Sequence, residues 1–288
     1  MAAAEAILRF LVLLLSFFGT LALAGIGLAV IFGIMGIINF AHGEFIMIGA
    51  YSTSIAYGAG LPLAGAILVG GLSTGLFGLV VERLLIRHMY DRLIDTLVAT
   101  WGLSLILIQV VQIQFGGSFG SIPVPFGTFQ YGTFSASMYK IALGLTALGL
   151  FAATYAVFTR TSYGLQARAA MQNKEMARSL GVDTGRIYML TFVFGSVLSG
   201  IAGGLFAPLT VLTPTMGSGY IVEAFVTVIV GGTNVLVGTF GAALSLGLIQ
   251  TPASQLFGTL GGRVALLVTT ILIIRVLPEG ISGVVARD

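Results

Sequence analysis

Three long runs without a charged residue constrain this sequence more than any other feature. They contain no Asp, Glu, Lys or Arg and lie at residues 96–139, 187–222 and 224–262. A helix needs about 20 apolar residues to cross a bilayer core about 30 Å thick. Each run can therefore supply at least one spanning helix, and the sequence predicts a protein that crosses the membrane several times.

The composition agrees with a membrane protein. Charged residues make up 8% of the 288 residues and apolar residues 57%, whereas soluble domains carry about 25% charged residues. Because lipid offers no hydrogen bonds, spanning segments are helices or closed barrels, and these runs are too continuously apolar for alternating barrel strands. We predict an all-α polytopic fold with a single membrane domain over residues 1–288. Without cysteine, the chain forms no disulfide.

Nine apolar segments follow from hydropathy along the chain, within a range of eight to ten spans. Several are short, and the 41 glycines indicate close helix packing and some broken or short helices. The first segment follows Glu5 and Arg9 and is too long for a cleavable signal sequence, so we expect a retained helix. The segments lie near residues 10–36, 39–57, 61–81, 93–115, 138–158, 187–209, 220–236, 237–257 and 263–278.

Basic residues predict the orientation in the membrane. Two segments between spans are rich in them, and the positive-inside rule places both on the cytoplasmic side. The uncharged stretch 116–137, with Pro123 and Pro125, fits a loop on the opposite side. Alternation then predicts an N-terminus outside and a C-terminus, near Arg275 and Arg287, inside. The basic residues are Arg83, Arg87 and Arg92 in one segment and Arg160, Arg168, Lys174, Arg178 and Arg186 in the other.

The second basic segment has the pattern of a short amphipathic helix. Met171, Met176 and Leu180 offer an apolar side, and Gly181 stands where a helix would end. Two interpretations are open. The helix could lie on the lipid surface with its basic residues at anionic headgroups, or it could dock a cytoplasmic partner.

Ionisable residues inside apolar segments are costly and are candidates for function. His42 and Glu44 are two residues apart, on different sides of a regular helix, so both would face one site only if the backbone broke near Gly43. Glu44 could instead cap the second span or serve as a hydrogen-bonded packing group. Glu223 is either an outer interfacial carboxylate or a substrate-facing acceptor beside Tyr220.

Asparagines at two positions share a spacing to glycine. Asn39 precedes Gly43 by four residues, as Asn234 precedes Gly238. A glycine-interrupted segment in each half is typical of an internal repeat that meets at a midplane site. The spacing hints at two related broken helices, and coincidence in so glycine-rich a chain is the alternative.

Thr100, Trp101 and Ser104 form a polar and aromatic cluster within the fourth span. The cluster could pack between helices or line a pathway. An enzyme within the membrane is disfavoured, because the two histidines and the widely separated carboxylates give no metal cluster or nucleophile–base pair.

Three motifs make the chain resemble the permease subunits of ABC importers for branched-chain amino acids and their urea-type relatives. They are GIINFAHGEFIMIGAY at 36–51, AMQNKEMARSLGV at 170–182 and GGTNVLVG at 231–238. Two further stretches, DTLVATWGLS at 95–104 and GYIVEAF at 219–225, resemble the urea-type (short-chain amide) branch more closely.

The resemblance implies a translocation subunit of the bacterial inner membrane. It would pair with a second, related permease, bind two cytoplasmic ATPase subunits and receive substrate from a periplasmic binding protein, with no nucleic acid partner. Residues 164–183 would be the coupling helix. Its candidate ATPase contacts are Arg168, Met171, Asn173, Glu175, Arg178 and Gly181.

The chain itself has no site for ATP. Lys140 and Lys174 are its only lysines, and neither follows the glycine pattern of a phosphate-binding loop. We therefore expect ATP to be hydrolysed by partner subunits and no cofactor to be bound by this chain.

Urea or a related small amide is the substrate that the sequence favours, because no Lys or Arg lies at mid-span depth to meet a carboxylate. Branched-chain amino acids are the alternative. A passive channel would need no docking helix, and Asn39-Phe-Ala and Asn234-Val-Leu lack the proline of Asn-Pro-Ala channel motifs. The candidate pathway residues are Asn39, His42, Glu44, Thr100, Trp101, Tyr220, Glu223 and Asn234.

Overall fold

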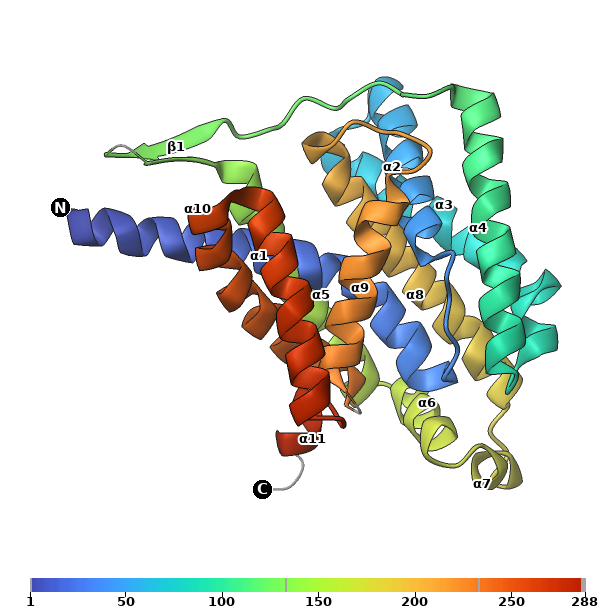
Figure 1. The fold of residues 1–288 in the computed structure, drawn as a ribbon. Helices are drawn as coiled ribbons and strands as arrows, with labels where there is room; N and C mark the ends of the chain where they lie inside the picture. The colour runs from blue at the N-terminus through green and yellow to red at the C-terminus, as the bar shows by residue number, and fades with distance from the viewer. Residues whose placement is uncertain (1, 133, 233, 286–288) are drawn as a thin grey trace. The chain divides into compact units, whose positions relative to one another are not determined.

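The computed structural model describes residues 2–132, 134–232 and 234–285, so Thr233 of the third motif and Arg287 lie outside the described residues. The predicted all-α fold is confirmed, with one short β-hairpin added (Figure 1). In chain order the elements are α1 Ala2–Met35, α2 His42–Gly58, α3 Leu63–Leu84, η1 Ile86–Met89, α4 Leu93–Phe115, β1 Thr128–Tyr131, β2 Phe134–Ser137, α5 Met138–Arg160, α6 Ser162–Gln172, α7 Lys174–Ser179, α8 Thr184–Phe206, η2 Ala207–Leu209, α9 Gly217–Gly231, α10 Val235–Val276 and α11 Ile281–Val285.

Six helical segments within the described residues are long and apolar enough to cross a membrane. The expected count of nine is therefore not confirmed. Two predicted spans, 39–57 and 220–236, form the shorter helices α2 and α9, of 17 and 15 residues. The last two predicted spans belong to one helical run, α10.

Helix α10 folds back on itself at Gly258. That glycine has φ 74°, in the left-handed region, inside a run of 42 residues. A Cβ on Gly262 would lie 3.3 Å from the Cα of Ser254, although residues eight apart in a straight helix are about 12 Å apart. The two arms of this hairpin correspond to the predicted segments 237–257 and 263–278 (Figure 1).

The chain divides into two compact units, described here one at a time. One contains residues 26–123 and 153–222, and the other contains residues 1–25, 124–152 and 223–288.

Helix α8 forms the core of the first unit and packs against α2 and α3. The packing is backbone to backbone: a Cβ on Gly203 would lie 1.9 Å from the Ile46 carbonyl oxygen, and one on Gly49 would lie 2.2 Å from that of Gly200. Small residues allow such close approach between membrane helices. This three-helix contact therefore accounts for part of the high glycine content.

In the second unit, α1, α5 and α10 supply the apolar contacts. A Cβ on Gly19 would lie 2.7 Å from the Gly144 Cα. The Phe240 ring packs edge-to-face on Phe18 and Phe151, at centroid distances of 5.3 and 5.7 Å. The stretch 116–137, expected to be a loop, contains the β1–β2 hairpin, in which Thr128 pairs with Ser137.

The described residues of the motif at 231–238 pack tightly where α9 ends and α10 begins. Gly232 has φ 82°, and a Cβ there would lie 2.1 Å from the Glu279 carbonyl oxygen. The Asn234 backbone N–H donates to Ser282 Oγ at 2.9 Å. Asn234 therefore stands at the start of α10 in a turn that closes against α11.

Candidate functional site

A non-helical connection at residues 36–41 links α1 to α2. Gly36, with φ 66°, ends α1. Asn39 Oδ1 accepts the Ala41 N–H at 3.0 Å, and Thr100 Oγ1 on α4 accepts the Phe40 N–H at 3.0 Å. Because Thr100 also donates to the Thr96 carbonyl at 2.8 Å, it joins this connection firmly to α4. Two predicted pathway residues, Asn39 and Thr100, are thus brought together.

His42 and Glu44 lie in the first turn of α2, which is regular from His42 onward. The condition for both to face one site, a backbone break near Gly43, is not met, because the non-helical backbone precedes them. Both side chains are buried, at 0% and 3% exposure, since α2 is enclosed on several sides. His42 meets Ser199 on α8, and Glu44 bonds to Ser104 on α4.

Gly43, which we expected to permit a break, instead permits close packing. A Cβ at this position would lie 2.5 Å from the Gly217 carbonyl oxygen at the start of α9. The glycine therefore lets α9 begin directly against the first turn of α2.

His42 contacts Ser199 on α8 through its Nδ1 atom. Ser199 Oγ donates to the Gly195 carbonyl at 2.8 Å, and it lies 3.4 Å from His42 Nδ1. The distance is long for a hydrogen bond, so the contact positions the ring only weakly.

Three buried polar atoms in this region have no hydrogen-bond partner: Asn39 Nδ2, Glu44 Oε2 and Tyr51 Oη. Their side chains are at most 3% exposed, and buried polar groups in proteins are almost always paired. Glu44 and Tyr51 are seven residues apart and share a face of α2. An unpaired donor, an unpaired acceptor and a hydroxyl within 13 residues mark a candidate site for a polar ligand.

An apolar cluster adjoins these atoms. In this cluster Met47, Ala50 and Tyr51 of α2 pack with Leu107 and Val111 of α4. The cluster also includes Ala207, which follows α8 directly, and Leu212, in the connection before α9. The Tyr51 ring packs on Phe115 and Phe119, at 5.2 and 5.5 Å. The site therefore has a polar end near the start of α2 and an apolar end farther along it.

Sequence reasoning did not select Tyr51, Ser104 or Ser199 as site residues. The position of Tyr51 seven residues after Glu44 was a usable signal, because it places both on one helix face. Ser104 had been noted only as part of the cluster with Trp101. Ser199 carries no such signal, since its contact with His42 joins residues 157 apart in sequence.

Of the other predicted pathway residues, Tyr220 adjoins the site and Trp101 does not. Trp101 is 55% exposed, whereas its neighbour Thr100 is fully buried, so the indole faces away from the site. The Tyr220 ring stacks on Phe206 at 4.4 Å and packs against the apolar cluster around Tyr51. Glu223 pairs with Arg263 at 3.6 Å, and Glu223 and Asn234 belong to the other compact unit.

The predicted helix over 164–183 is two helices, α6 and α7, so that prediction was wrong about continuity. Asn173, with φ −155° and ψ 102°, interrupts the run, and its side chain accepts the Met176 N–H at 2.9 Å. An asparagine that caps a new helix competes with continuation of the preceding one. We call residues 162–181 the docking segment.

Gly181 ends α7 as the sequence predicted. It has φ 86°, its N–H donates to the Arg178 carbonyl, and the Val182 N–H reaches back to the Ala177 carbonyl at 3.0 Å. This pair of bonds is a Schellman motif.

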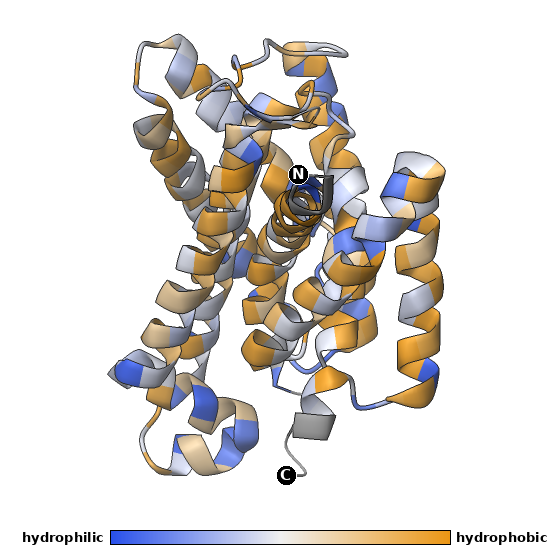
Figure 2. Ribbon diagram, turned by 90° about the vertical axis from the view of Figure 1, so that its left-hand side faces the viewer, coloured by the Kyte–Doolittle hydropathy of each residue, from blue (hydrophilic) through white to orange (hydrophobic). Residues whose placement is uncertain are grey.

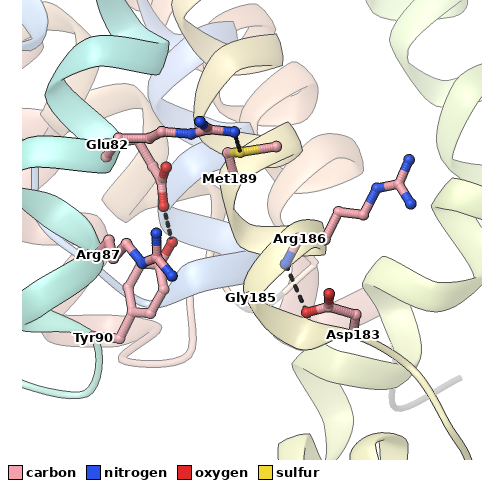
Figure 3. A pocket seen from close by; sticks show the side chains of 8 residues that line it. Glu82, Arg87, Tyr90, Asp183, Gly185, Arg186 and Met189 are labelled. Carbon is pink, nitrogen blue, oxygen red and sulfur yellow. Dashed lines mark hydrogen bonds between the residues drawn. The ribbon is translucent and has the colours of Figure 1, made fainter.

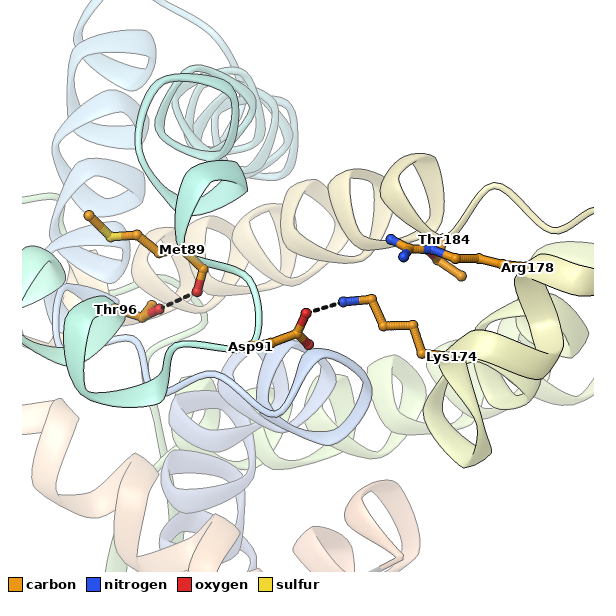
Figure 4. A network of polar contacts seen from close by, with 6 residues as sticks. All are labelled: Met89, Asp91, Thr96, Lys174, Arg178 and Thr184. Atoms are coloured by element: carbon orange, nitrogen blue, oxygen red, sulfur yellow. Dashed lines mark hydrogen bonds and ion pairs between the residues drawn. The ribbon is translucent and has the colours of Figure 1, made fainter.

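Two contacts tie α7 to the neighbouring helices (Figure 4). Lys174 forms an ion pair with Asp91, in the connection before α4, and its ammonium lies 5.4 Å from the centroid of the Tyr188 ring on α8. Arg178 Nε donates to Thr184 Oγ1 at 2.7 Å. α7 is therefore attached both to the connection before α4 and to the start of α8.

The docking segment exposes both apolar and charged side chains. Its polar character contrasts with the long apolar helices (Figure 2). Four large apolar side chains project from it, together with the exposed Arg168, Glu175 and Arg178. The apolar ones are Leu165, Met171, Met176 and Leu180. Such a mixed surface suits a protein partner.

Replacement of Gly181 by valine should weaken the coupling to an ATPase that the resemblance implies for this segment. A β-branched residue at positive φ costs about 1–3 kcal/mol, and no neighbouring atom lies within 4 Å of a Cβ there, so the effect comes from backbone strain alone. We expect a disordered end of α7 and reduced transport with the protein still inserted. Gly181→Asn, which tolerates the left-handed region, is the control and should retain most of the activity.

The helices define a multi-pass membrane protein, and comparison with known sequences identifies the family. The family model described as branched-chain amino acid transport system, permease component, matches residues 10–277. The chain therefore belongs to this family of ABC importer permeases, and it is a permease component rather than an enzyme.

Individual relatives agree. The chain is 32% identical to the high-affinity branched-chain amino acid transport system permease protein LivH of Escherichia coli K12, over 92% of this chain and 91% of the relative. It is 29% identical to BraD of Pseudomonas aeruginosa, a permease protein of the same kind of system, over 92% of both chains. LivM of Salmonella typhimurium is 30% identical over 64% of this chain and 49% of the relative. No solved structure matches the chain significantly.

These comparisons confirm the importer permease family that the motifs indicated. They give no specific support to the urea-type branch, since these relatives are named for branched-chain amino acids. The stretches at 95–104 and 219–225 therefore do not identify the substrate.

Proposed function

We propose that this chain is the permease subunit of an ATP-driven importer that carries branched-chain amino acids across the bacterial inner membrane. The observation that supports this most strongly is the similarity to LivH along 92% of the chain. Urea, which the sequence alone favoured, becomes the rival hypothesis. Residues 1–288 act as one permease domain in this proposal.

The buried polar atoms offer a chemical reason for an amino acid substrate. Glu44 Oε2 is an unpaired acceptor and Asn39 Nδ2 an unpaired donor, which complement the ammonium and the carboxylate of an α-amino acid. The apolar cluster around Met47 and Leu107 suits a branched aliphatic side chain. The lack of a mid-span cation had suggested urea. In this proposal the Asn39 amide takes the place of that cation, because it can donate a hydrogen bond to the carboxylate.

The attachment of the docking segment suggests how ATP hydrolysis reaches this site. α7 is tied to the start of α4 and to α8. The same two helices hold the polar site: α4 through Thr100 and Ser104, and α8 through Ser199. A rearrangement of a partner ATPase would move these helices together and alter access to the site.

The proposal includes the partners of such an importer. They are a second, related permease, two cytoplasmic ATPase subunits on the docking segments, and a periplasmic binding protein. In this arrangement the N-terminus is periplasmic, the C-terminus is cytoplasmic, and ATP is used only by the partner subunits.

The test is uptake of labelled leucine and labelled urea by vesicles that contain the whole complex, with and without ATP on the cytoplasmic side. ATP-dependent leucine uptake that excess valine reduces and urea does not is the expected result. ATP-dependent urea uptake without leucine uptake would restore the rival hypothesis, and flux without ATP would overturn the importer mechanism.

Glu44→Gln should reduce leucine uptake through a higher KM. The amide keeps the size of the side chain and its contact with Ser104 but loses the charge that would meet an ammonium, which we expect to cost about tenfold in apparent affinity. Tyr51→Phe, which keeps the ring packing on Phe115, should have a smaller effect. The measurement is the concentration dependence of uptake, and an unchanged KM in Glu44→Gln would exclude Glu44 from substrate contact.

A further inference from the structure

A second polar site lies apart from the proposed pathway, where the end of α3, η1 and the start of α8 meet. It is a cavity of about 350 Å³, within the range of roughly 300–1,000 Å³ typical of small-ligand sites. Figure 3 shows Glu82, Arg87 and Tyr90 on one side and Asp183 and Arg186 on the other. Neither the proposed transport route nor the docking segment uses these side chains.

Both carboxylates of this cavity already have partners. Glu82, which is 2% exposed, accepts a hydrogen bond from the Tyr90 hydroxyl. Burial and the neighbouring Glu82 raise the pKa of Tyr90, so the hydroxyl stays protonated and keeps donating. Asp183 Oδ1 accepts the Arg186 N–H at 3.0 Å and caps α8.

The cavity's arginines have no such partners. Within the described ranges, Arg83, Arg87 and Arg186 form no ion pair, and Arg83 makes only a weak contact with the Met189 sulfur at 3.7 Å. Three guanidinium groups against two carboxylates leave a formal charge of +1. The cavity therefore favours a singly charged anion.

The cavity lies at the end of α3, which is long and apolar enough to cross a membrane. Large apolar side chains are exposed along this helix, and none of them lines the cavity. They are Leu72, Leu76, Val80 and Leu84. The basic cavity therefore adjoins the end of an apolar helix.

We propose that this cavity binds the phosphodiester headgroup of an anionic phospholipid. A phosphodiester carries one negative charge, which matches the cavity, and guanidinium groups bind phosphate oxygens well. Basic residues beside a span are attracted to an anionic leaflet. A nucleotide polyphosphate is a poorer match, because it carries several negative charges where the cavity offers a formal charge of +1.

The test measures retained lipid in the whole complex by native mass spectrometry after exchange into mixed phosphatidylglycerol and phosphatidylcholine. The double variant Arg83→Gln/Arg87→Gln should lose about thirtyfold in phosphatidylglycerol affinity, roughly fivefold for each arginine. Arg160→Gln, which removes a basic residue at the end of α5 outside the cavity, is the matched control and should keep the wild-type affinity. Arg83→Lys/Arg87→Lys, which keeps the charge, should lose much less than the glutamine pair.

Further arms identify the source of the phosphate and guard against misfolding. Soluble glycerol phosphate and inorganic phosphate at millimolar concentration should not displace the lipid, and displacement by either would show a site for a free anion. Wild-type complex should retain phosphatidylglycerol over phosphatidylcholine, a comparison that needs no variant. Equal retention of the two lipids, or equal loss in Arg160→Gln, would overturn the proposal.

Discussion

Gly203→Val should prevent assembly of the permease. A Cβ at this position would lie 1.9 Å from the Ile46 carbonyl oxygen and 2.9 Å from the Ala50 nitrogen. Both are backbone atoms of α2, so no side chain can rotate away, and α2 and α8 must separate. Overpacking of a flexible core costs about 1–3 kcal/mol, and a clash with backbone costs more. We expect the complex to be absent from the monodisperse peak in size-exclusion chromatography.

A matched pair of glycines separates this effect from helix propensity. Gly49→Val strikes the same interface from the α2 side, where a Cβ would lie 2.2 Å from the Gly200 carbonyl oxygen, and should fail in the same way. Gly149→Val, in α5, meets no atom within 4 Å and should assemble normally. Normal assembly of Gly203→Val would show that the α2–α8 contact is looser than the structure indicates.

Under the proposed function, Lys174→Asp should separate ATP hydrolysis from transport. The change replaces an attractive contact with Asp91 by a repulsive one and removes the ammonium from the Tyr188 ring. The pair is partly exposed, with the Asp91 side chain 69% accessible, and surface ion pairs contribute only about 0–1 kcal/mol to stability, so the protein should still insert and bind the proposed ATPase. We expect ATP hydrolysis near the wild-type rate and leucine uptake reduced several-fold, measured in the same vesicles.

The charge-swapped pair gives this prediction a specific control. Asp91→Lys together with Lys174→Asp restores attraction between the α7 and α4 sides, and it should recover much of the uptake that each single variant loses. If the double variant is no better than the single ones, the ion pair does not carry the movement, and the Arg178–Thr184 contact becomes the stronger candidate.

The sequence predicted the helices well because hydropathy and charge act locally. The expected span 93–115 coincides with α4, and Gly181 ends α7 as its conformational freedom suggested. The interruption at Asn173 was missed, since both helices continue one amphipathic pattern and only the cap marks the boundary. The sequence indicated the reversal at Gly258 only as a gap between the predicted segments 237–257 and 263–278.

The candidate site was predictable only in part. Asn39, His42, Glu44 and Thr100 were selected, and the structure gathers them in one region. Ser199 could not be found, because its contact with His42 depends on how α8 packs against α2. Trp101 was selected for its chemistry, yet helix geometry turns it away from Thr100. The substrate depends on a few atoms whose arrangement hydropathy does not encode.

The hairpin in α10 determines whether the chain crosses the membrane an even or an odd number of times after α9. A straight helix of 42 residues would be about 63 Å long, twice the thickness of the apolar layer it has to match. The reversal at Gly258 instead returns the chain to where it started, and Asn234 is bonded to Ser282. The end of α9 and the last described residues therefore lie on the same side of the bilayer. A reporter group at either position should react with a membrane-impermeant reagent added to that side.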